Sequence, residues 1–523
     1  MHVHGLARRP AGYVVASTLT SLGGFLFGID TGIIGPVTVM PDFAKYASDS
    51  SSPTIHGLIV SSILIPAAIS SFFAGRLADA IGRHWAIAIG AFVFGLGAAI
   101  EAASVHIAMF VSGRVIEGIG EGLYLSNLVV YICEISPPRN RGTLTNGPQL
   151  LVTMGLVTGF FTCYGTATME STFSWRLPFM LLAAYSFTFA GAVLLWLPAS
   201  PRWLTLRGRT SEASEIWEKL GVPSADREKI MHQREAVMVV ESDNNEAGGE
   251  NSSGIANPAP AGLLGHGQPV KSNKAKALVL GLFAPDTRSR LFLAVFLMGM
   301  QQLSGIDGVL YYAPVLFQQA GLSSAKASFL ASGVSAIVIF AVSIPAMIFA
   351  DRWSRRANTI LGGIGMGITM FLMGGLYAGG AVHADSGAGR WIIVASIYVF
   401  AIIFSISWAV VIRIYAAEIQ PQKTRAAATS LAHGSNWLSN FLVALVTPTL
   451  LARTSYGAYF LFGSCSVVTA LVCWAFMPET RGKSLDEIEQ AFYDTRGSRR
   501  GLKAFGTVLR RKLPWGMPPA IDA

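Results

Sequence analysis

Charged residues are scarce in this sequence. Only 13% of its 523 residues are Asp, Glu, Lys or Arg, whereas 52% are hydrophobic. A soluble domain carries about 25% charged residues. The scarcity excludes a single soluble core and indicates a membrane protein that crosses the bilayer several times. The formal net charge of +9 does not indicate nucleic-acid binding, because a basic surplus in a membrane protein usually marks its cytoplasmic face.

Cysteine is also rare. Cys133, Cys163, Cys465 and Cys473 all fall in or beside apolar segments, so neither a disulfide framework nor a zinc site is predicted. We find no nucleophile–base set and no metal-ligand spacing, and we therefore expect neither an enzyme nor a cofactor. The polar start, MHVHGLARRP, runs into an apolar segment without a small-residue cleavage site. This pattern predicts an uncleaved first span.

Twelve apolar segments have the length of a membrane-spanning helix, about 20 residues. They lie near 12–36, 57–78, 84–104, 107–133, 147–168, 177–197, 290–318, 327–350, 358–380, 391–416, 427–451 and 457–477. Both termini and every second short connection fall on one side, and that side carries most of the Arg and Lys residues. The positive-inside rule makes this side cytoplasmic, and we expect the plasma membrane as the location.

The charged connections repeat in order across the two sets of six spans. GRLADAIGRH at 75–84 corresponds to FADRWSRR at 349–356, and EISPPRNRG at 134–142 corresponds to EIQPQKTRA at 418–426. The prediction is therefore an all-α membrane protein with two pseudo-symmetric six-helix halves, a layout of secondary transporters. Its parts are the N-terminal half (1–198), a cytoplasmic linker (199–288), the C-terminal half (289–481) and a cytoplasmic tail (482–523). Within the linker, 241–273 is too polar to fold, and the tail begins with a short helix at 485–492.

The seventh predicted span contains a dense polar stretch, QQLSGIDGVLYY at 301–312. Lipid does not tolerate two amides and an acid, so these side chains must face protein or a water-filled cavity. One interpretation is packing between helices, with small residues and interhelical amide bonds. The other is one wall of a binding site for a polyhydroxylated ligand. The density of polar groups favours the binding wall.

Asp30 is a single carboxylate deep in the first span, and such a residue is a functional candidate by default. Arg114, in the fourth span, is its predicted partner, and together they can form a proton relay. Glu117 and Glu121 lie three and seven residues after Arg114, on the same helical face. They offer a competing interpretation, in which they pair with Arg114 for structural reasons alone.

Acids and arginines recur at the predicted cytoplasmic ends of the spans in both halves. Charges placed there can pair across helices and hold the cytoplasmic side closed, so they predict a gate. The alternative is topology signalling and snorkelling alone. The predicted gate residues are Asp79, Arg83, Glu134, Arg141, Asp351, Arg355, Glu418 and Arg425.

Seven stretches resemble the sugar porter family of the major facilitator superfamily, and most closely its fungal proton/monosaccharide symporters. The stretches are GRLADAIGRH, GRVIEGIG, EISPPRNRG, PASPRWL, QQLSGIDGVLYYAP, SNWLSNF and PETRGKSLDEIEQAF. The resemblance implies the major facilitator fold and alternating-access transport of a small polar solute, a hexose or pentose, with protons. We also expect the protein to function as a monomer.

The resemblance also implies roles for individual residues. Asp30 matches the proton-coupling acid of the first helix. The matching substrate and gate positions are Phe27, Gln149, Gln301, Gln302, Tyr311, Tyr312, Asn436 and Trp437. Amides offer both donors and acceptors to sugar hydroxyls, and aromatic faces pack on the ring.

The sequence departs from the family pattern at several positions. Asp307 stands where the family has Asn, and Arg413 lies in a segment that replaces a Gly-Pro-x-x-Trp pattern; Ile339, Ala199 and Ser354 are further departures. Asp307 and Arg413 can pair, Arg413 can bind a substrate carboxylate, or Arg413 can snorkel to the surface. A polyol, a quinate-like acid or a secondary metabolite is therefore an alternative substrate, and a non-transporting sugar sensor is an alternative function.

Overall fold

The computed structural model describes residues 11–47, 52–224, 283–284, 287–322, 325–349, 352–383, 387–421, 424–482 and 487. Every regular element in these ranges is a helix, so the all-α prediction is confirmed. The predictions for 241–273, for Asp351 and, apart from Glu487, for 485–492 lie outside the described residues.

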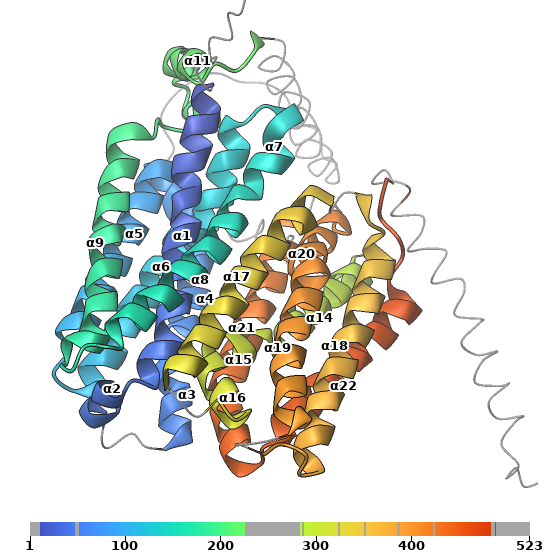
Figure 1. Cartoon of the computed structure of the whole chain (residues 1–523). Coiled ribbons are helices and arrows are strands. Elements are labelled where there is room, and N and C mark those ends of the chain that lie inside the picture. Colours follow the sequence, from blue (N-terminus) through green and yellow to red (C-terminus); the bar gives the residue numbers. More distant parts are fainter. Residues whose placement is uncertain are drawn as a thin grey trace, which may run out of the picture. The chain divides into compact units, whose positions relative to one another are not determined.

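Within the described residues, the first half of the sequence forms the helices α1 to α11, which are coloured from blue to green in Figure 1. They are α1 (Gly12–Thr38), α2 (Pro41–Tyr46), α3 (Pro53–Ser61), α4 (Leu64–Ile81), α5 (Arg83–Ala103), α6 (Ile107–Ile135), α7 (Pro138–Thr145), α8 (Gly147–Thr166), α9 (Phe173–Trp196), α10 (Pro201–Leu206) and α11 (Thr210–Lys219).

The second half forms the remaining described helices. They are α14 (Arg288–Leu303), α15 (Ile306–Tyr311), α16 (Ala313–Gln319), α17 (Ala325–Phe349), α18 (Arg355–Ala378), α19 (Ala388–Ile406), α20 (Trp408–Glu418), α21 (Arg425–Arg453) and α22 (Gly457–Phe476).

Ten helical segments within the described residues are long and apolar enough to cross a membrane. Three of them are made of two consecutive helices each: α3 with α4, α14 with α15, and α19 with α20. The other two predicted spans, near 147–168 and 427–451, coincide with the long helices α8 and α21. The helices therefore follow the apolar segments of the sequence closely.

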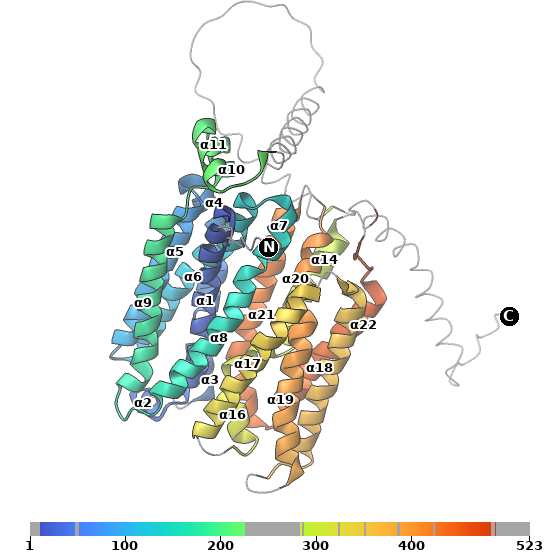
Figure 2. The ribbon, with the colours of Figure 1, turned by 45° about the horizontal axis from the view of Figure 1, so that its top comes forward.

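The chain forms two compact units. The first unit comprises Met1–Val279, Asp307–Ala341 and Ala444–Ala452, and the second comprises Leu280–Ile306, Val342–Val443 and Arg453–Ala523. In the first unit, α1 packs against α8, and α5 packs against both α6 and α9 (Figure 2). In the second unit, α18 packs against α19, α20 and α22, and α14 packs against α20.

Glycines allow α1 and α8 to pack backbone against backbone. A Cβ atom at Gly28 would lie 2.0 Å from the carbonyl oxygen of Val152, and one at Gly155 would lie 2.3 Å from that of Phe25. Small residues permit such close helix contacts in membranes. Residues two positions apart on a helix do not share a face, so the α8-facing position of Gly28 directs Asp30 away from α8.

Two predicted spans in the second half are interrupted. Helix α14 ends at Leu303, and Gly305, whose φ is +89°, precedes α15. Helices α19 and α20 are separated at Ser407, and the carbonyl oxygen of Ile406 beside the interruption accepts a hydrogen bond from Asn358 Nδ2 (3.2 Å). Non-helical backbone at membrane depth is tolerated only where protein or a water-filled cavity satisfies it. These interruptions therefore mark protein-lined places in the spans.

Candidate functional site

Gln301 and Gln302 in the last turn of α14 and Asn436 of α21 form a cluster, which we call the amide cluster. Asn436 Nδ2 donates to Gln301 Oε1 (3.2 Å) and to the carbonyl oxygen of Met298 (2.9 Å), and Gln302 Nε2 donates to Asn436 Oδ1 (3.2 Å). Gln301 Nε2 donates to the carbonyl oxygen of Trp408, next to the interruption between α19 and α20 (2.7 Å). The structure thus brings together three of the predicted substrate-binding amides and places them beside two helix interruptions.

The amide cluster retains hydrogen-bonding capacity. Gln302 Oε1 and Asn440 Oδ1 are buried oxygens without a hydrogen-bond partner among the described residues. A buried acceptor left unsatisfied is costly, and a ligand hydroxyl would satisfy either one. Sequence reasoning missed Asn440, although its spacing of four residues from Asn436 predicts the same helical face.

The amide cluster belongs to the second unit, whereas the acid and the tyrosines of the predicted seventh span belong to the first. Asp307 is half-buried, whereas Tyr311 and Tyr312 are buried. The Tyr312 hydroxyl donates to the carbonyl oxygen of Ala444 in α21 (2.6 Å), and a Cβ atom at Gly35 of α1 would lie 2.0 Å from the carbonyl oxygen of Tyr311. The backbone of Tyr311 therefore packs closely on α1, and the hydroxyl of Tyr312 bonds α21.

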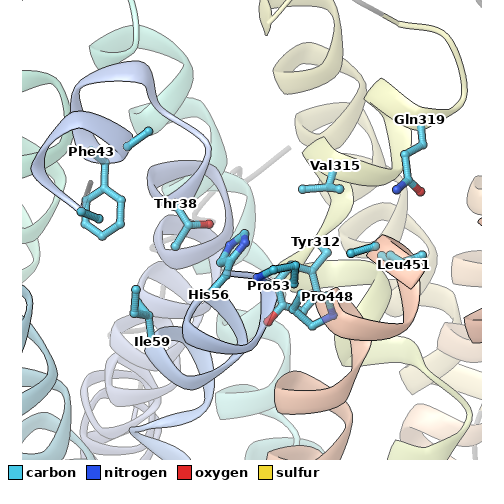
Figure 3. A pocket seen from close by; sticks show the side chains of 13 residues that line it. Thr38, Phe43, Pro53, His56, Ile59, Tyr312, Val315, Gln319, Pro448 and Leu451 are labelled. Atoms are coloured by element: carbon cyan, nitrogen blue, oxygen red, sulfur yellow. The ribbon is translucent and has the colours of Figure 1, made fainter. Parts of the chain in front are cut away.

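A cavity of about 330 Å³ adjoins Tyr312 within the first unit (Figure 3). Thr38 and Phe43 line one side of it, and Gln319 of α16 lines the opposite side. The His56 ring packs edge-on against Tyr312, with ring centroids 5.3 Å apart. His56 Nε2 and Gln319 Oε1 are buried and have no hydrogen-bond partner in the described part of the chain. The cavity therefore offers a small space with polar groups next to the predicted gate.

Asp30 and Arg114 are in direct contact. Arg114 Nη1 donates to Asp30 Oδ1 over 2.6 Å, and both side chains are almost fully buried. The same nitrogen donates to Glu117 Oε2 (2.8 Å), and Glu101 Oε2 of α5 lies 4.0 Å away. Two of the three partners that the sequence offered to Arg114, Asp30 and Glu117, are thus engaged at once. The carboxylate oxygens of the third, Glu121, have no hydrogen-bond partner among the described residues. Sequence reasoning missed Glu101, because helical spacing relates residues of one helix only.

The remaining predicted substrate residues differ in exposure. Phe27 of α1 and Gln149 of α8 are half-buried in the first unit, and Trp437 of α21 is half-buried in the second. Arg413 of α20 is exposed. An exposed guanidinium is free of the desolvation cost that a buried one carries.

The predicted gate residues of the N-terminal half form a connected group. Arg83, at the start of α5, pairs with Asp79 of α4 and, over 3.3 Å, with Glu134 of α6. Arg141 donates to the carbonyl oxygen of Ser136 (3.4 Å). Three helix ends are therefore tied together through the Arg83 guanidinium.

The C-terminal half repeats this arrangement. Arg355, at the start of α18, pairs with Glu418 of α20 over 3.4 Å, and Arg425 donates to the carbonyl oxygen of Gln420. Glu479, from the PETRG stretch, accepts hydrogen bonds from the Ser354 hydroxyl and from the backbone N–H groups of Arg355 and Arg356. Its carboxylate thus binds the N-terminus of α18, a favourable place for negative charge.

Ser354, the departure from the family glycine, acts as a helix cap. Its hydroxyl accepts a hydrogen bond from the backbone N–H of Ala357 and donates to Glu479. Burial alone would raise the pKa of Glu479, but hydrogen bonds from Ser354 and from backbone N–H groups outweigh it and hold the pKa below 4.5.

Glu479→Gln is expected to lower the thermal unfolding temperature by a few degrees at pH 7. Because the folded pKa lies below its usual value, the carboxylate stabilises the fold fully above pH 4.5 and loses this effect as the pH falls through the lowered pKa. Unfolding of the detergent-solubilised protein and variant should therefore converge at acid pH. An equal difference at all pH values would show that the charge of Glu479 has no part.

Comparison with solved structures identifies the fold. The chain is similar to the proton:xylose symporter XylE of E. coli, with a TM-score of 0.69 and 25% identity over 92% of this chain and 99% of that one. The fold is that of the major facilitator superfamily, two sets of six transmembrane helices.

Comparison with sequence families is more specific. A family model described as sugar (and other) transporter matches residues 16–492, and the chain belongs to this family. It is similar to sugar transport protein 4 of Arabidopsis thaliana, 28% identical over 91% of this chain and 90% of the relative. It is also similar to hexose transporter 2 of Kluyveromyces lactis, 29% identical over 93% and 84%. The protein is therefore a multi-pass membrane transporter, as the sequence predicted.

Proposed function

We propose that the protein moves a monosaccharide, a hexose or a pentose, across the plasma membrane in symport with protons. The amide cluster binds the sugar hydroxyls, Asp30 carries the proton, and access alternates between the two membrane sides. The termini lie in the cytoplasm and one chain is sufficient for transport.

The contact between Asp30 and Arg114 carries the proposal. A buried carboxylate that pairs with a guanidinium changes its affinity for protons when the pair opens. The conformational change of a transporter can therefore load and release a proton at Asp30. The names of the relatives, which are sugar, hexose and xylose transporters, support a sugar as the solute.

The test is uptake by proteoliposomes of a panel of sugars, polyols and acids, with and without an inward proton gradient. A hexose or pentose is expected to accumulate only with the gradient. Equal accumulation without the gradient would reject proton coupling. Sugar binding without any uptake would instead indicate a sensor.

A carboxylated solute is the second candidate, because Arg413 is an exposed cation where the family pattern is uncharged. Bidentate guanidinium geometry suits a carboxylate. If Arg413 binds the solute, Arg413→Trp is expected to shift the substrate preference in the same panel from acids to neutral sugars.

If Arg413 only extends its guanidinium to the membrane surface, Arg413→Lys leaves the substrate preference unchanged. A shift of preference in that variant would rule this alternative out.

A further inference from the structure

The buried cluster around Arg114 contains more carboxyl groups than a proton-coupling pair needs. Asp30, Glu101, Glu117 and Glu121 are each 3% exposed or less, and Arg114 is the cation that they surround. If all four acids were ionised, the cluster would hold four negative charges and one positive charge. Uncompensated buried charge is strongly unfavourable. Some of these carboxyl groups must therefore hold protons.

Glu117 contacts Arg114 as closely as Asp30 does. One nitrogen, Nη1, donates to Asp30 Oδ1 at 2.6 Å and to Glu117 Oε2 at 2.8 Å. The guanidinium therefore has a second negative partner that stays in place when Asp30 becomes neutral.

Glu101 lies farther from the cation than Glu117 does. Its Oε2 is 4.0 Å from Arg114 Nη1, and neither of its carboxylate oxygens has a hydrogen-bond partner among the described residues. A buried carboxylate without such partners is costly to ionise. The negative charge beside the guanidinium is therefore expected on Glu117 rather than on Glu101.

Close packing of α5 on α6 brings these two glutamates close together. A Cβ atom at Gly97 would lie 2.5 Å from the backbone nitrogen of Glu117, and one at Gly113 would lie 2.7 Å from Cγ of Glu101. Side chains at these glycines would push the helices apart. The two glutamates therefore meet because both helices carry glycine opposite them.

We propose that Glu117 is a positioning residue for coupling: it is the second counter-ion of Arg114 and keeps the guanidinium paired while Asp30 carries its proton. This inference rests on the proposed proton symport. With Asp30 ionised and with Glu101 and Glu121 neutral, the charges of Asp30, Arg114 and Glu117 sum to one negative charge. When a proton from the membrane exterior binds Asp30, the sum becomes zero, and no cation is left unpaired in the dry interior.

The other titratable groups near Glu117 do not replace it in this role. Both carboxylate oxygens of Glu121 lack a hydrogen-bond partner within the described residues, and Tyr124 and Tyr185 are neutral hydroxyls. The charged and titratable groups that face the cluster are Asp30 from α1, Glu101 from α5, Arg114, Glu121 and Tyr124 from α6, and Tyr185 from α9.

The experiment compares the pH dependence of proton-driven D-glucose uptake in proteoliposomes. Glu117→Gln is expected to shift the midpoint of this pH dependence to a lower pH by about one pH unit or more. The reason is that removal of a nearby negative charge makes protonation of Asp30 harder. Glu101→Gln is expected to keep the wild-type midpoint of the pH dependence, because it replaces a neutral carboxyl group by a neutral amide. Glu121→Gln, the same change on the same helix, is the matched control and should also keep it.

The outcomes separate this inference from the proposed function. Wild-type uptake that does not depend on pH rejects proton symport itself. Wild-type uptake that depends on pH, with Glu117→Gln equal to Glu121→Gln, overturns the role of Glu117. An equal shift of the midpoint in Glu101→Gln would place the negative charge on Glu101 rather than on Glu117, and would also overturn the inference. Uptake driven by a sodium gradient at constant pH would assign the cluster to a metal ion instead.

A second measurement applies if Glu117→Gln does not fold. With Glu117 as counter-ion, Asp30→Asn leaves Arg114 paired, so its thermal unfolding temperature is expected to match that of the wild type. A large loss of stability in Asp30→Asn would show that Asp30 alone compensates the guanidinium, and would overturn the inference.

Discussion

Asp30→Asn is expected to abolish proton-driven accumulation of the sugar and to leave sugar exchange measurable. Asparagine keeps the shape of the side chain, and its oxygen can still accept the hydrogen bond from Arg114 Nη1. A neutral amide cannot carry a proton, so the proton gradient can no longer drive the cycle. The measurements are uptake with an inward proton gradient and counterflow exchange without one, both in proteoliposomes.

Glu121→Gln is the control for this change, because it removes a carboxyl of equal burial that has no hydrogen bond to Arg114. It should accumulate sugar as the wild type does. If Asp30→Asn still concentrates sugar against its gradient, Asp30 is not the coupling acid. If both accumulation and exchange are lost while the protein remains folded, Asp30 is needed for binding or movement rather than for coupling.

The positions of the spans could be predicted from the sequence because apolar length is a local property. The first span was expected near 12–36 and α1 covers Gly12–Thr38, and the fourth was expected near 107–133 and α6 covers Ile107–Ile135. The contact between Asp30 and Arg114 could also be anticipated. A buried acid requires a cation, and few basic residues lie deep in the predicted spans.

The parts that escaped prediction depend on contacts between helices. Glu101 joins the Arg114 cluster from α5, and nothing in its own helix indicates that α5 and α6 meet there. Glu479 reaches the start of α18 from beyond the end of α22. The interruption at Ser407 has no glycine or proline beside it in the sequence. It becomes intelligible only when Asn358 of α18 is seen to bond the carbonyl oxygen of Ile406.

Loss of the amide cluster is the other large effect that we expect. Asn436→Ala removes the group that bonds both Gln301 Oε1 and Gln302 Nε2, so it disturbs both neighbours as well as any hydroxyl bound there. Gln301→Ala removes one neighbour and frees the carbonyl oxygen of Trp408. Each change is expected to weaken sugar binding by on the order of 1–3 kcal/mol, the usual cost of leaving a buried polar partner unsatisfied.

Equilibrium binding of labelled sugar to the purified protein measures this effect, and Gln318→Ala on α16 is the matched control, because it removes an exposed glutamine. Gln318→Ala should bind as the wild type does. Because Gln302 Nε2 bonds Asn436 Oδ1, a double-mutant cycle between these two residues is expected to be non-additive. Binding within twofold of wild type in both Gln301→Ala and Asn436→Ala would place the sugar elsewhere, and the cavity beside His56 and Gln319 would then become the first candidate.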